Sequence, residues 1–205
     1  MKAMKKIVDH SDKLGIRYLT VYAFSTENWK RSIAEVSGIF KLLVTYVNSE
    51  LKELVENNVK VTVLGDYRQI PSDAEKSLEK TLEETKNNTG LQFNIALNYG
   101  GQRRDPSQRS DTCRESSARR FAAGGDHRRH DRCMNCCTGK FSCGFPDPEL
   151  IIRTSGEERL SNFLLWQSAY SELVFADALW PDFTPEEYEK AIEEYQSRDR
   201  RFGGR

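Results

Sequence analysis

The chain alternates short apolar runs with longer amphipathic ones, and this alternation constrains the fold more than any other feature. Runs rich in β-branched and aromatic residues predict strands at 17–24, 60–64, 92–97, 150–153 and 173–175. Apolar residues at helical spacing predict helices at 4–14, 34–58, 72–87, 162–170 and 185–200. Strands that alternate with helices predict an α/β fold: a single domain over 1–205 with a mostly parallel central sheet and helices on both faces.

Polar residues at the predicted strand ends indicate where a site would lie. In open parallel sheets, ligands bind at the carboxyl ends of the strands. Four residues fall at such ends: Phe24, Ser25, Asn98 and Arg153.

Helix caps are predicted at Ser72, with Glu75 completing a capping box, and at Thr184.

Composition narrows the class of protein. The formal net charge is zero, so no overall basic field favours nucleic acid as a partner. No run is long and apolar enough to cross a membrane, and the lysine-rich start does not resemble a signal peptide. We therefore expect a cytoplasmic protein whose 205 residues form one domain with an adequate core.

The segment 149–172 combines an apolar strand, a turn and a second apolar run. Arg153 follows the strand, Gly156 permits a tight turn, and Arg159 comes after it. Ser161 stands where a helix N-cap is predicted, beside the free N–H groups and positive dipole end of the helix. Two guanidinium groups near a helix start favour a diphosphate ligand. The alternative is that the arginines form ordinary salt bridges at a strand end.

Three further motifs accompany this segment in order. They are Tyr22-Ala-Phe-Ser-Thr-Glu-Asn-Trp29, Asn98-Tyr-Gly-Gly101 and Trp180-Pro-Asp-Phe183, and an Arg-Arg-Phe-Gly-Gly run follows near the end. Together the motifs resemble those of the cis-prenyltransferases, most of all the bacterial undecaprenyl diphosphate synthases. The resemblance covers about 1–101 and 145–204.

The resemblance implies a magnesium-dependent enzyme that condenses isopentenyl diphosphate onto an allylic diphosphate such as farnesyl diphosphate. The product would be a long polyprenyl diphosphate, a lipid carrier for cell-wall sugars. A homodimer is implied, with peripheral membrane contact through the lipid product.

The resemblance also implies residue roles, each with a plainer alternative. Asn28 would act at the reacting centre, and Glu172 would bind Mg²⁺; they could also be a turn residue and a solvated carboxylate. The substrate-binding residues would be Phe24, Ser25, Trp29, Arg31, Arg153, Arg159 and Ser161. For Phe24 and Trp29, core packing is the alternative.

The family's first motif, an Asp-Gly-Asn-Gly-Arg-Trp loop, does not occur in these 205 residues. Because its aspartate helps to bind magnesium in the family, we expect little or no activity from the chain as written. Two other classes stay open: a non-catalytic accessory subunit and a defective gene product. Retention of Arg153, Arg159, Ser161 and Glu172 favours the enzyme.

Residues 102–144 depart from the rest of the chain. They contain no Leu, Ile or Val but all five cysteines, a composition that predicts disorder. One interpretation is a zinc-binding insertion through His127, His130, Cys133 and Cys136. Another is a functional arginine-rich loop. A reading-frame change is the interpretation that we favour, and the nucleotide sequence would distinguish the three.

Overall fold

The computed structural model of the protein describes residues 2–101 and 145–199. It divides into two compact units, the central unit (Arg17–Phe145) and the terminal unit (Met1–Ile16 with Pro146–Arg205). The predictions of disorder and of a zinc site at 102–144 lie outside the described residues. A single domain over the whole chain stays a prediction, and each unit is treated separately below.

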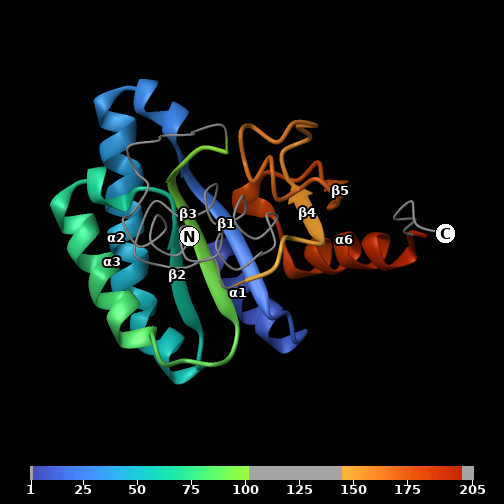
Figure 1. Cartoon of the computed structure of the whole chain (residues 1–205), viewed down its shortest axis with the longest axis horizontal. Helices are drawn as coiled ribbons and strands as arrows, with labels where there is room; N and C mark the ends of the chain where they lie inside the picture. The colour runs from blue at the N-terminus through green and yellow to red at the C-terminus, as the bar shows by residue number, and fades with distance from the viewer. Residues whose placement is uncertain (1, 102–144, 200–205) are drawn as a thin grey trace, which may run out of the picture. The chain divides into compact units, whose positions relative to one another are not determined.

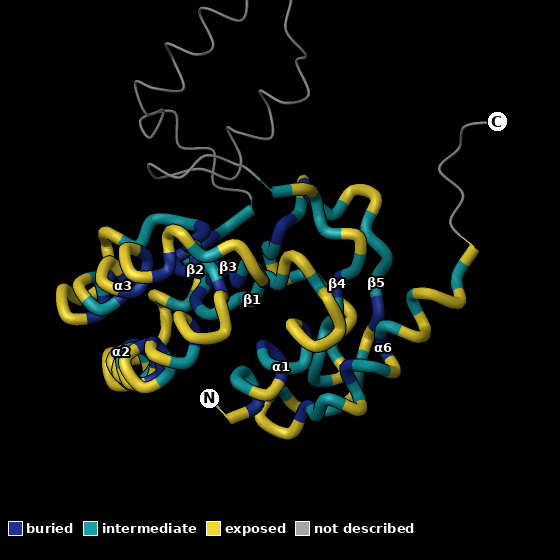
Figure 2. The backbone as a smooth tube through the Cα atoms, turned by 90° about the horizontal axis from the view of Figure 1, so that it is seen from below, coloured by how far each residue is buried: buried dark blue, intermediate teal, exposed yellow. Residues whose placement is uncertain are grey.

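A parallel sheet forms the core of the central unit. Its strands are β1 (Tyr18–Ser25), β2 (Lys60–Leu64) and β3 (Gln92–Tyr99), in the order β1-β3-β2 (Figure 1). β3 lies in the middle and is buried over seven of its eight positions. Buried backbone is dark blue in Figure 2. A strand buried on both faces is typical of parallel sheets covered by other elements, so this part of the fold prediction is confirmed.

Two helices, α2 (Ile33–Glu56) and α3 (Ser72–Thr85), pack against each other in the central unit. The buried face of α2 consists of Phe40, Leu43, Tyr46, Val47, Leu51 and Leu54. A capping box starts this helix: Ser32 Oγ accepts from the Glu35 N–H, and the Glu35 carboxylate accepts from the Ser32 N–H.

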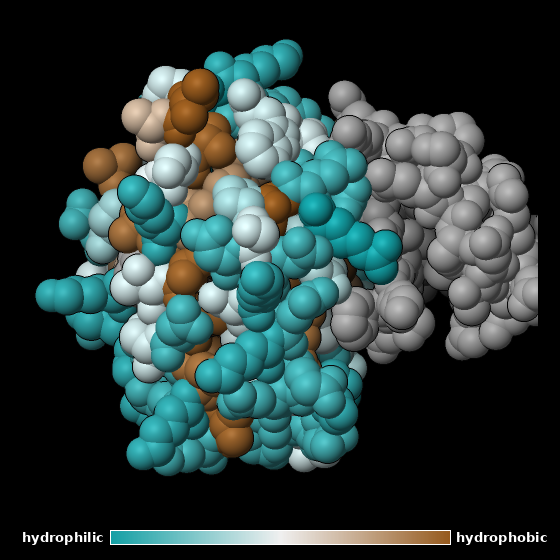
Figure 3. Space-filling model, turned by 90° about the vertical axis from the view of Figure 1, so that its left-hand side faces the viewer, coloured by the Kyte–Doolittle hydropathy of each residue, from teal (hydrophilic) through white to brown (hydrophobic). Residues whose placement is uncertain are grey.

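On the face of the molecule that corresponds to the left of Figure 1, hydrophobic side chains form a broken band among hydrophilic ones (Figure 3).

The predicted cap of α3 is wrong by one residue. Pro71, rather than Ser72, occupies the N-cap, and no side chain caps the helix. The Pro71 carbonyl accepts from the N–H groups of Ala74 and Glu75, both at 3.0 Å. Because the helix already begins at this carbonyl, Ser72 lies within its first turn and cannot form the box with Glu75.

The terminal unit contains a second parallel pair, β4 (Leu150–Arg153) and β5 (Glu172–Phe175), in which Ile151 pairs with Leu173. Helix α1 (Lys2–Lys13) packs against α6 (Pro185–Ser197) and against the short helix η4 (Trp180–Asp182). A capping box of Thr184 and Glu187 starts α6, which confirms the predicted cap.

The helix predicted at 162–170 does not form. Ser161, Asn162 and Leu164 have positive φ angles of 46°, 66° and 43°, and the backbone runs through successive turns up to Tyr170. A right-handed helix needs negative φ at every position, so these residues interrupt it. Serine and asparagine also compete for backbone hydrogen bonds and thereby favour turns.

No helix in the described ranges combines the length and apolar character needed to cross a bilayer.

Candidate active site

The turn after β1 holds the first group of predicted site residues. β1 ends at Ser25 and leads directly into the 3-10 helix η1 (Thr26–Lys30). The Ser25 N–H donates to Asn28 Oδ1 at 2.9 Å, and the Arg31 N–H donates to the Asn28 carbonyl at 3.0 Å. These bonds fix Asn28 by its oxygens, while its Nδ2 has no hydrogen-bond partner within the ranges 2–101 and 145–199. Asn28 can therefore donate to an anion.

An aromatic cluster supports this turn. The ring centroids of Phe24 and Trp29 lie 5.0 Å apart, and those of Phe24 and Phe40 lie 4.8 Å apart. Phe24 is 1% exposed, whereas Trp29 is 41% exposed. The structure thus places Phe24 in the core beneath Trp29, and Trp29 is the ring that solvent reaches. A substrate contact remains a prediction for both residues.

Tyr22 also approaches the end of β3. Its hydroxyl donates to the Tyr99 carbonyl at 2.9 Å, and the two rings meet edge to face. Burial raises the pKa of Tyr22 to about 12, partly offset by a hydrogen bond with Ser25. The phenol is therefore neutral at physiological pH.

The turn after β4 holds the second group. Ser155 and Gly156 both have positive φ, and their N–H groups donate to the carbonyls of Ala178 and Ala176 at 2.8 and 3.0 Å. Arg153, at the end of β4, has its Nε buried and without a hydrogen-bond partner in the part of the chain that the structure describes. A buried, unpaired guanidinium N–H is unfavourable, so an anion that accepts from it would be stabilised.

Arg159 and Ser161 differ from the prediction in their surroundings. The Arg159 side chain is 66% exposed and pairs with Glu157. Ser161 is exposed and starts no helix, so helix N–H groups and a helix dipole do not contribute to this turn. The anion-binding groups that remain from the prediction are the two arginines and the Ser161 hydroxyl.

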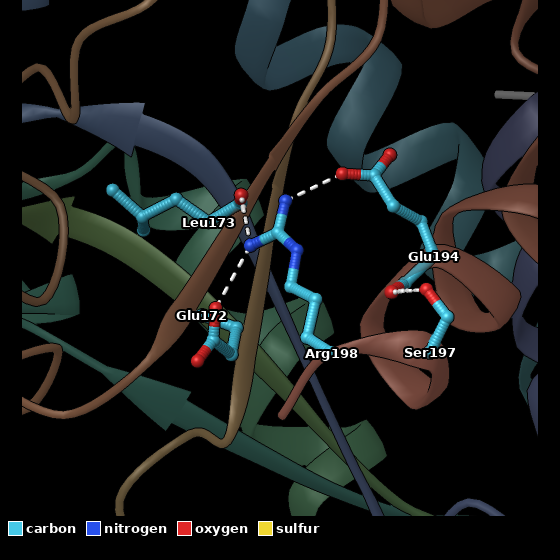
Figure 4. Close-up of polar contacts among 5 residues, drawn as sticks. All are labelled: Glu172, Leu173, Glu194, Ser197 and Arg198. Carbon is cyan, nitrogen blue, oxygen red and sulfur yellow. Dashed lines mark hydrogen bonds and ion pairs between the residues drawn. The ribbon is translucent and has the colours of Figure 1, made fainter. Parts of the chain in front are cut away.

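Glu172, at the start of β5, is held by Arg198. The Arg198 Nη1 donates to Glu172 Oε2 at 2.8 Å and to the Leu173 carbonyl at 3.0 Å, while Nη2 pairs with Glu194 (Figure 4). The hydrogen bonds that Arg198 donates, first to Glu172 and then to Glu194, raise the pKa of Arg198. Sequence reasoning missed Arg198; only its i,i+4 spacing from Glu194 signals an ion pair.

Within residues 2–101 and 145–199, the contacts of Glu172 leave one carboxylate oxygen, Oε1, available for another ligand. No group of three or more His, Cys, Asp or Glu residues in the described ranges could hold a metal by itself. A metal at Glu172 would therefore need oxygen atoms from elsewhere.

Comparison with known proteins identifies the family. The family profile described as "Putative undecaprenyl diphosphate synthase" matches residues 1–203. An isoprenyl transferase of Clostridium perfringens is 46% identical over 204 residues, which span the whole of this chain and 79% of that protein. The Micrococcus luteus ditrans,polycis-undecaprenyl-diphosphate synthase, named as specific for (2E,6E)-farnesyl diphosphate, is 45% identical and is covered to 80%.

Solved structures agree with the sequence comparison. A "probable undecaprenyl diphosphate synthase" from Campylobacter jejuni has a TM-score of 0.78 at 29% identity, over 99% of this chain and 91% of that one. Lavandulyl diphosphate synthase from Lavandula x intermedia, in complex with dimethylallyl diphosphate, has a TM-score of 0.82 at 29% identity, with 99% and 86% covered. The chain belongs to the cis-prenyltransferase family, and the predicted fold class and enzyme class are confirmed.

Proposed function

We propose that the protein condenses isopentenyl diphosphate onto an allylic diphosphate, farnesyl diphosphate, to give a long polyprenyl diphosphate. The observation that carries the proposal is the buried, unpaired Nε of Arg153 at the carboxyl end of β4. The printed name of the Micrococcus luteus relative supports farnesyl diphosphate as the allylic substrate.

In this proposal the turn after β4 binds the diphosphate of isopentenyl diphosphate. Arg153 donates through its unpaired Nε, and Arg159 exchanges its exposed pairing with Glu157 for a diphosphate oxygen. Exposed ion pairs contribute little to stability, so this exchange costs little. Ser161 supplies a hydroxyl donor rather than a helix start.

The turn after β1 binds the allylic diphosphate. Asn28 offers its Nδ2 donors, Arg31 adds a guanidinium, and Ser25 adds a hydroxyl. Trp29 supplies an apolar, partly exposed ring for the hydrocarbon part, supported from below by Phe24.

Glu172 fits the role of a magnesium ligand through the chemistry of its free Oε1. Mg²⁺ is often held by one or two carboxylates together with substrate phosphate oxygens, so Glu172 would be one of its protein ligands. When bound, the ion neutralises charge on the departing diphosphate. Arg198 holds the other oxygen of Glu172 and so fixes the direction in which Oε1 points.

The proposed reaction balances without a covalent intermediate on the protein. The allylic C–O bond breaks, and its electron pair leaves with pyrophosphate. The double bond of isopentenyl diphosphate attacks the allylic carbon, and loss of a proton from the isopentenyl unit restores a double bond. The task of Asn28, Arg31, Arg153 and Arg159 is to position the two diphosphates and to stabilise negative charge.

The proposal extends to a homodimer that acts in the cytoplasm and delivers its lipid product to a membrane. Its support is the family resemblance together with the lack of a membrane-crossing helix in the described ranges.

The test combines binding and turnover. Titration calorimetry would measure isopentenyl diphosphate binding, and labelled isopentenyl diphosphate with farnesyl diphosphate and Mg²⁺ would measure chain elongation. We expect binding that Arg153→Ala weakens. Elongation that a chelator abolishes would support the proposed activity, whereas little or no elongation is the result expected for these 205 residues from the missing Asp-Gly-Asn-Gly-Arg-Trp loop. Arg68→Ala, which removes an exposed arginine of the central unit, is the control and should leave binding unchanged. Equal binding by Arg153→Ala and the unsubstituted protein would overturn the assignment of this turn.

A further inference from the structure

Asn98 connects the turns that follow all three strands of the central sheet. It lies near the end of β3 and is 2% exposed. Its Oδ1 accepts from Trp29 Nε1 at 2.8 Å, and its Nδ2 donates to the Asp66 carbonyl at 2.8 Å. An indole can only donate and a backbone carbonyl can only accept, so these two partners fix the orientation of the amide.

The backbone around Asn98 is shaped to make these contacts. Asn98 has a φ of 49°, a left-handed conformation that asparagine adopts more readily than most residues. The Asp66 N–H donates back to the Asn98 carbonyl at 3.4 Å. At Gly65 a Cβ atom would lie 2.2 Å from the Leu97 carbonyl oxygen, so only glycine lets the chain after β2 approach this closely.

The bond to Asn98 determines how Trp29 is held. Trp29 belongs to a five-residue 3-10 helix and is 41% exposed, so much of its ring has no packing partner among the described residues, 2–101 and 145–199. Its packing contacts are with Phe24 and Phe40, and packing of this kind permits the ring to slide or tilt. A hydrogen bond from the indole to a buried amide removes that freedom, and Asn28 is the adjacent residue.

We propose that Asn98 is a positioning residue for the allylic-diphosphate site, acting through Trp29. It holds the indole at one orientation and thereby holds Asn28 and its Nδ2 donors at the carboxyl edge of the sheet. This inference rests on the proposed function, and it assigns Asn98 no contact with substrate.

The first variant, Asn98→Gly, removes both hydrogen bonds and still permits a positive φ. In protein labelled with ¹⁵N-tryptophan, we expect the Trp29 indole N–H to exchange with solvent at least tenfold faster than before, because its acceptor is gone. The KM for farnesyl diphosphate should rise about five- to tenfold, the effect expected from one ordinary hydrogen bond. The KM for isopentenyl diphosphate should change less than twofold.

Two further variants separate positioning from folding. Asn98→Asp keeps an acceptor for the indole but loses the donor to Asp66, so indole exchange should stay slow while stability falls. Trp29→Phe removes the indole donor and leaves the Asn98–Asp66 bond intact. The double variant Asn98→Gly/Trp29→Phe should raise the farnesyl diphosphate KM by less than the product of the two single effects, because both substitutions remove the same hydrogen bond.

The matched control is Asn88→Ala. Asn88 Nδ2 donates to the Val59 carbonyl at 2.8 Å, next to the amino end of β2, so the variant loses a similar bond without touching Trp29. It should lower stability and leave the indole exchange rate and both KM values unchanged.

The inference is overturned if Asn98→Gly leaves indole exchange unchanged, or if it changes both KM values equally. If Asn98→Gly does not fold, Trp29→Phe takes its place as the test of the hydrogen bond. An unchanged farnesyl diphosphate KM in Trp29→Phe then overturns the inference. Lack of turnover by the unsubstituted protein, the result expected from the missing Asp-Gly-Asn-Gly-Arg-Trp loop, would instead count against the proposed activity of these 205 residues. The indole exchange of Asn98→Gly would still decide whether Asn98 positions Trp29.

Discussion

The turns after β1 and after β4 both follow parallel strands, but they differ in how their polar groups are satisfied. In the turn after β1, Asn28 Oδ1 and the Trp29 indole are both hydrogen-bonded within the protein. In the turn after β4, Arg153 Nε is buried without a partner in the described ranges, and Arg159 has an exposed pairing with Glu157. The first turn is organised before any ligand binds, whereas we propose that an anion completes the second.

The largest expected effect concerns the close approach that organises the first turn. Gly65→Ala places a Cβ against the Leu97 carbonyl at a φ of 105°, so the chain after β2 must move away from Asn98. We expect a loss of several kcal/mol in the free energy of unfolding, since steric overlap adds to a backbone strain of about 1–2 kcal/mol. Urea denaturation measures it.

The matched control for this variant is Gly38→Ala in α2, where an added Cβ meets nothing within 4 Å. Alanine is the better helix former, so this change should stabilise the protein by about 0.5–1 kcal/mol. Equal effects at the two glycines would contradict the steric account of the first turn.

The next effect concerns the second turn. Arg153→Ala should weaken isopentenyl diphosphate binding about ten- to a hundredfold, because a charge-assisted hydrogen bond to a partly buried group is lost. Arg153→Lys keeps the charge but lacks the Nε donor, so it should recover only part of the affinity. Arg159→Ala should cost less than Arg153→Ala, since solvent screens its 66% exposed side chain. Calorimetric titration distinguishes these outcomes, and a larger loss for Arg159→Ala would reverse the assignment.

A smaller effect tests the helix caps of the two units. Ser32→Ala removes the cap of α2 in the central unit, and Thr184→Ala removes that of α6 in the terminal unit. Each should lower the free energy of unfolding by about 1 kcal/mol. Serine at position 184 should restore most of the loss, and a Thr184→Ser variant less stable than Thr184→Ala would argue against the capping box.

The last effect is a pH dependence at the edge of the first turn, which is absent at neutral pH and develops only in alkaline solution. The folded-state pKa of Tyr22 is raised to about 12 from an ordinary value of 10, because burial disfavours the phenolate. The neutral phenol therefore contributes stability that is fully present below pH 10 and is lost as pH rises from 10 to about 12. Tyr22→Phe should flatten this part of the stability profile, which an ultraviolet-monitored alkaline titration of both proteins would show. An unchanged profile in Tyr22→Phe would assign the loss to other groups.

Local sequence pattern was sufficient for much of the fold. The strands Lys60–Leu64 and Leu150–Arg153 and the cap at Thr184 agree with their predicted positions, because period and capping chemistry act over a few residues. The helix predicted at 162–170 was wrong because backbone conformation, which the hydrophobic period does not encode, decides that segment. Its apolar residues fit a helical period, but left-handed backbone at Ser161 and Asn162 breaks the helix, and the hydrophobic pattern carries no signal of that.

The candidate site was predictable only in part. Ser25, Asn98 and Arg153 could be placed at the ends of strands because the apolar runs that predict those strands end beside them. The bonds from Asn98 to Trp29 and from Arg198 to Glu172 join residues 69 and 26 positions apart, so no local pattern specifies them. The unpaired Nε of Arg153 depends on what packs around it, which only the folded structure shows.

Amide hydrogen exchange with and without isopentenyl diphosphate tests the central claim most directly, because it follows both turns in one experiment. The account predicts that isopentenyl diphosphate increases protection across 153–161, where its diphosphate is proposed to bind. Protection of 25–31 should change little, because that turn is assigned to the other substrate and is already organised. Protection confined to 25–31, with 153–161 unaffected, would contradict it.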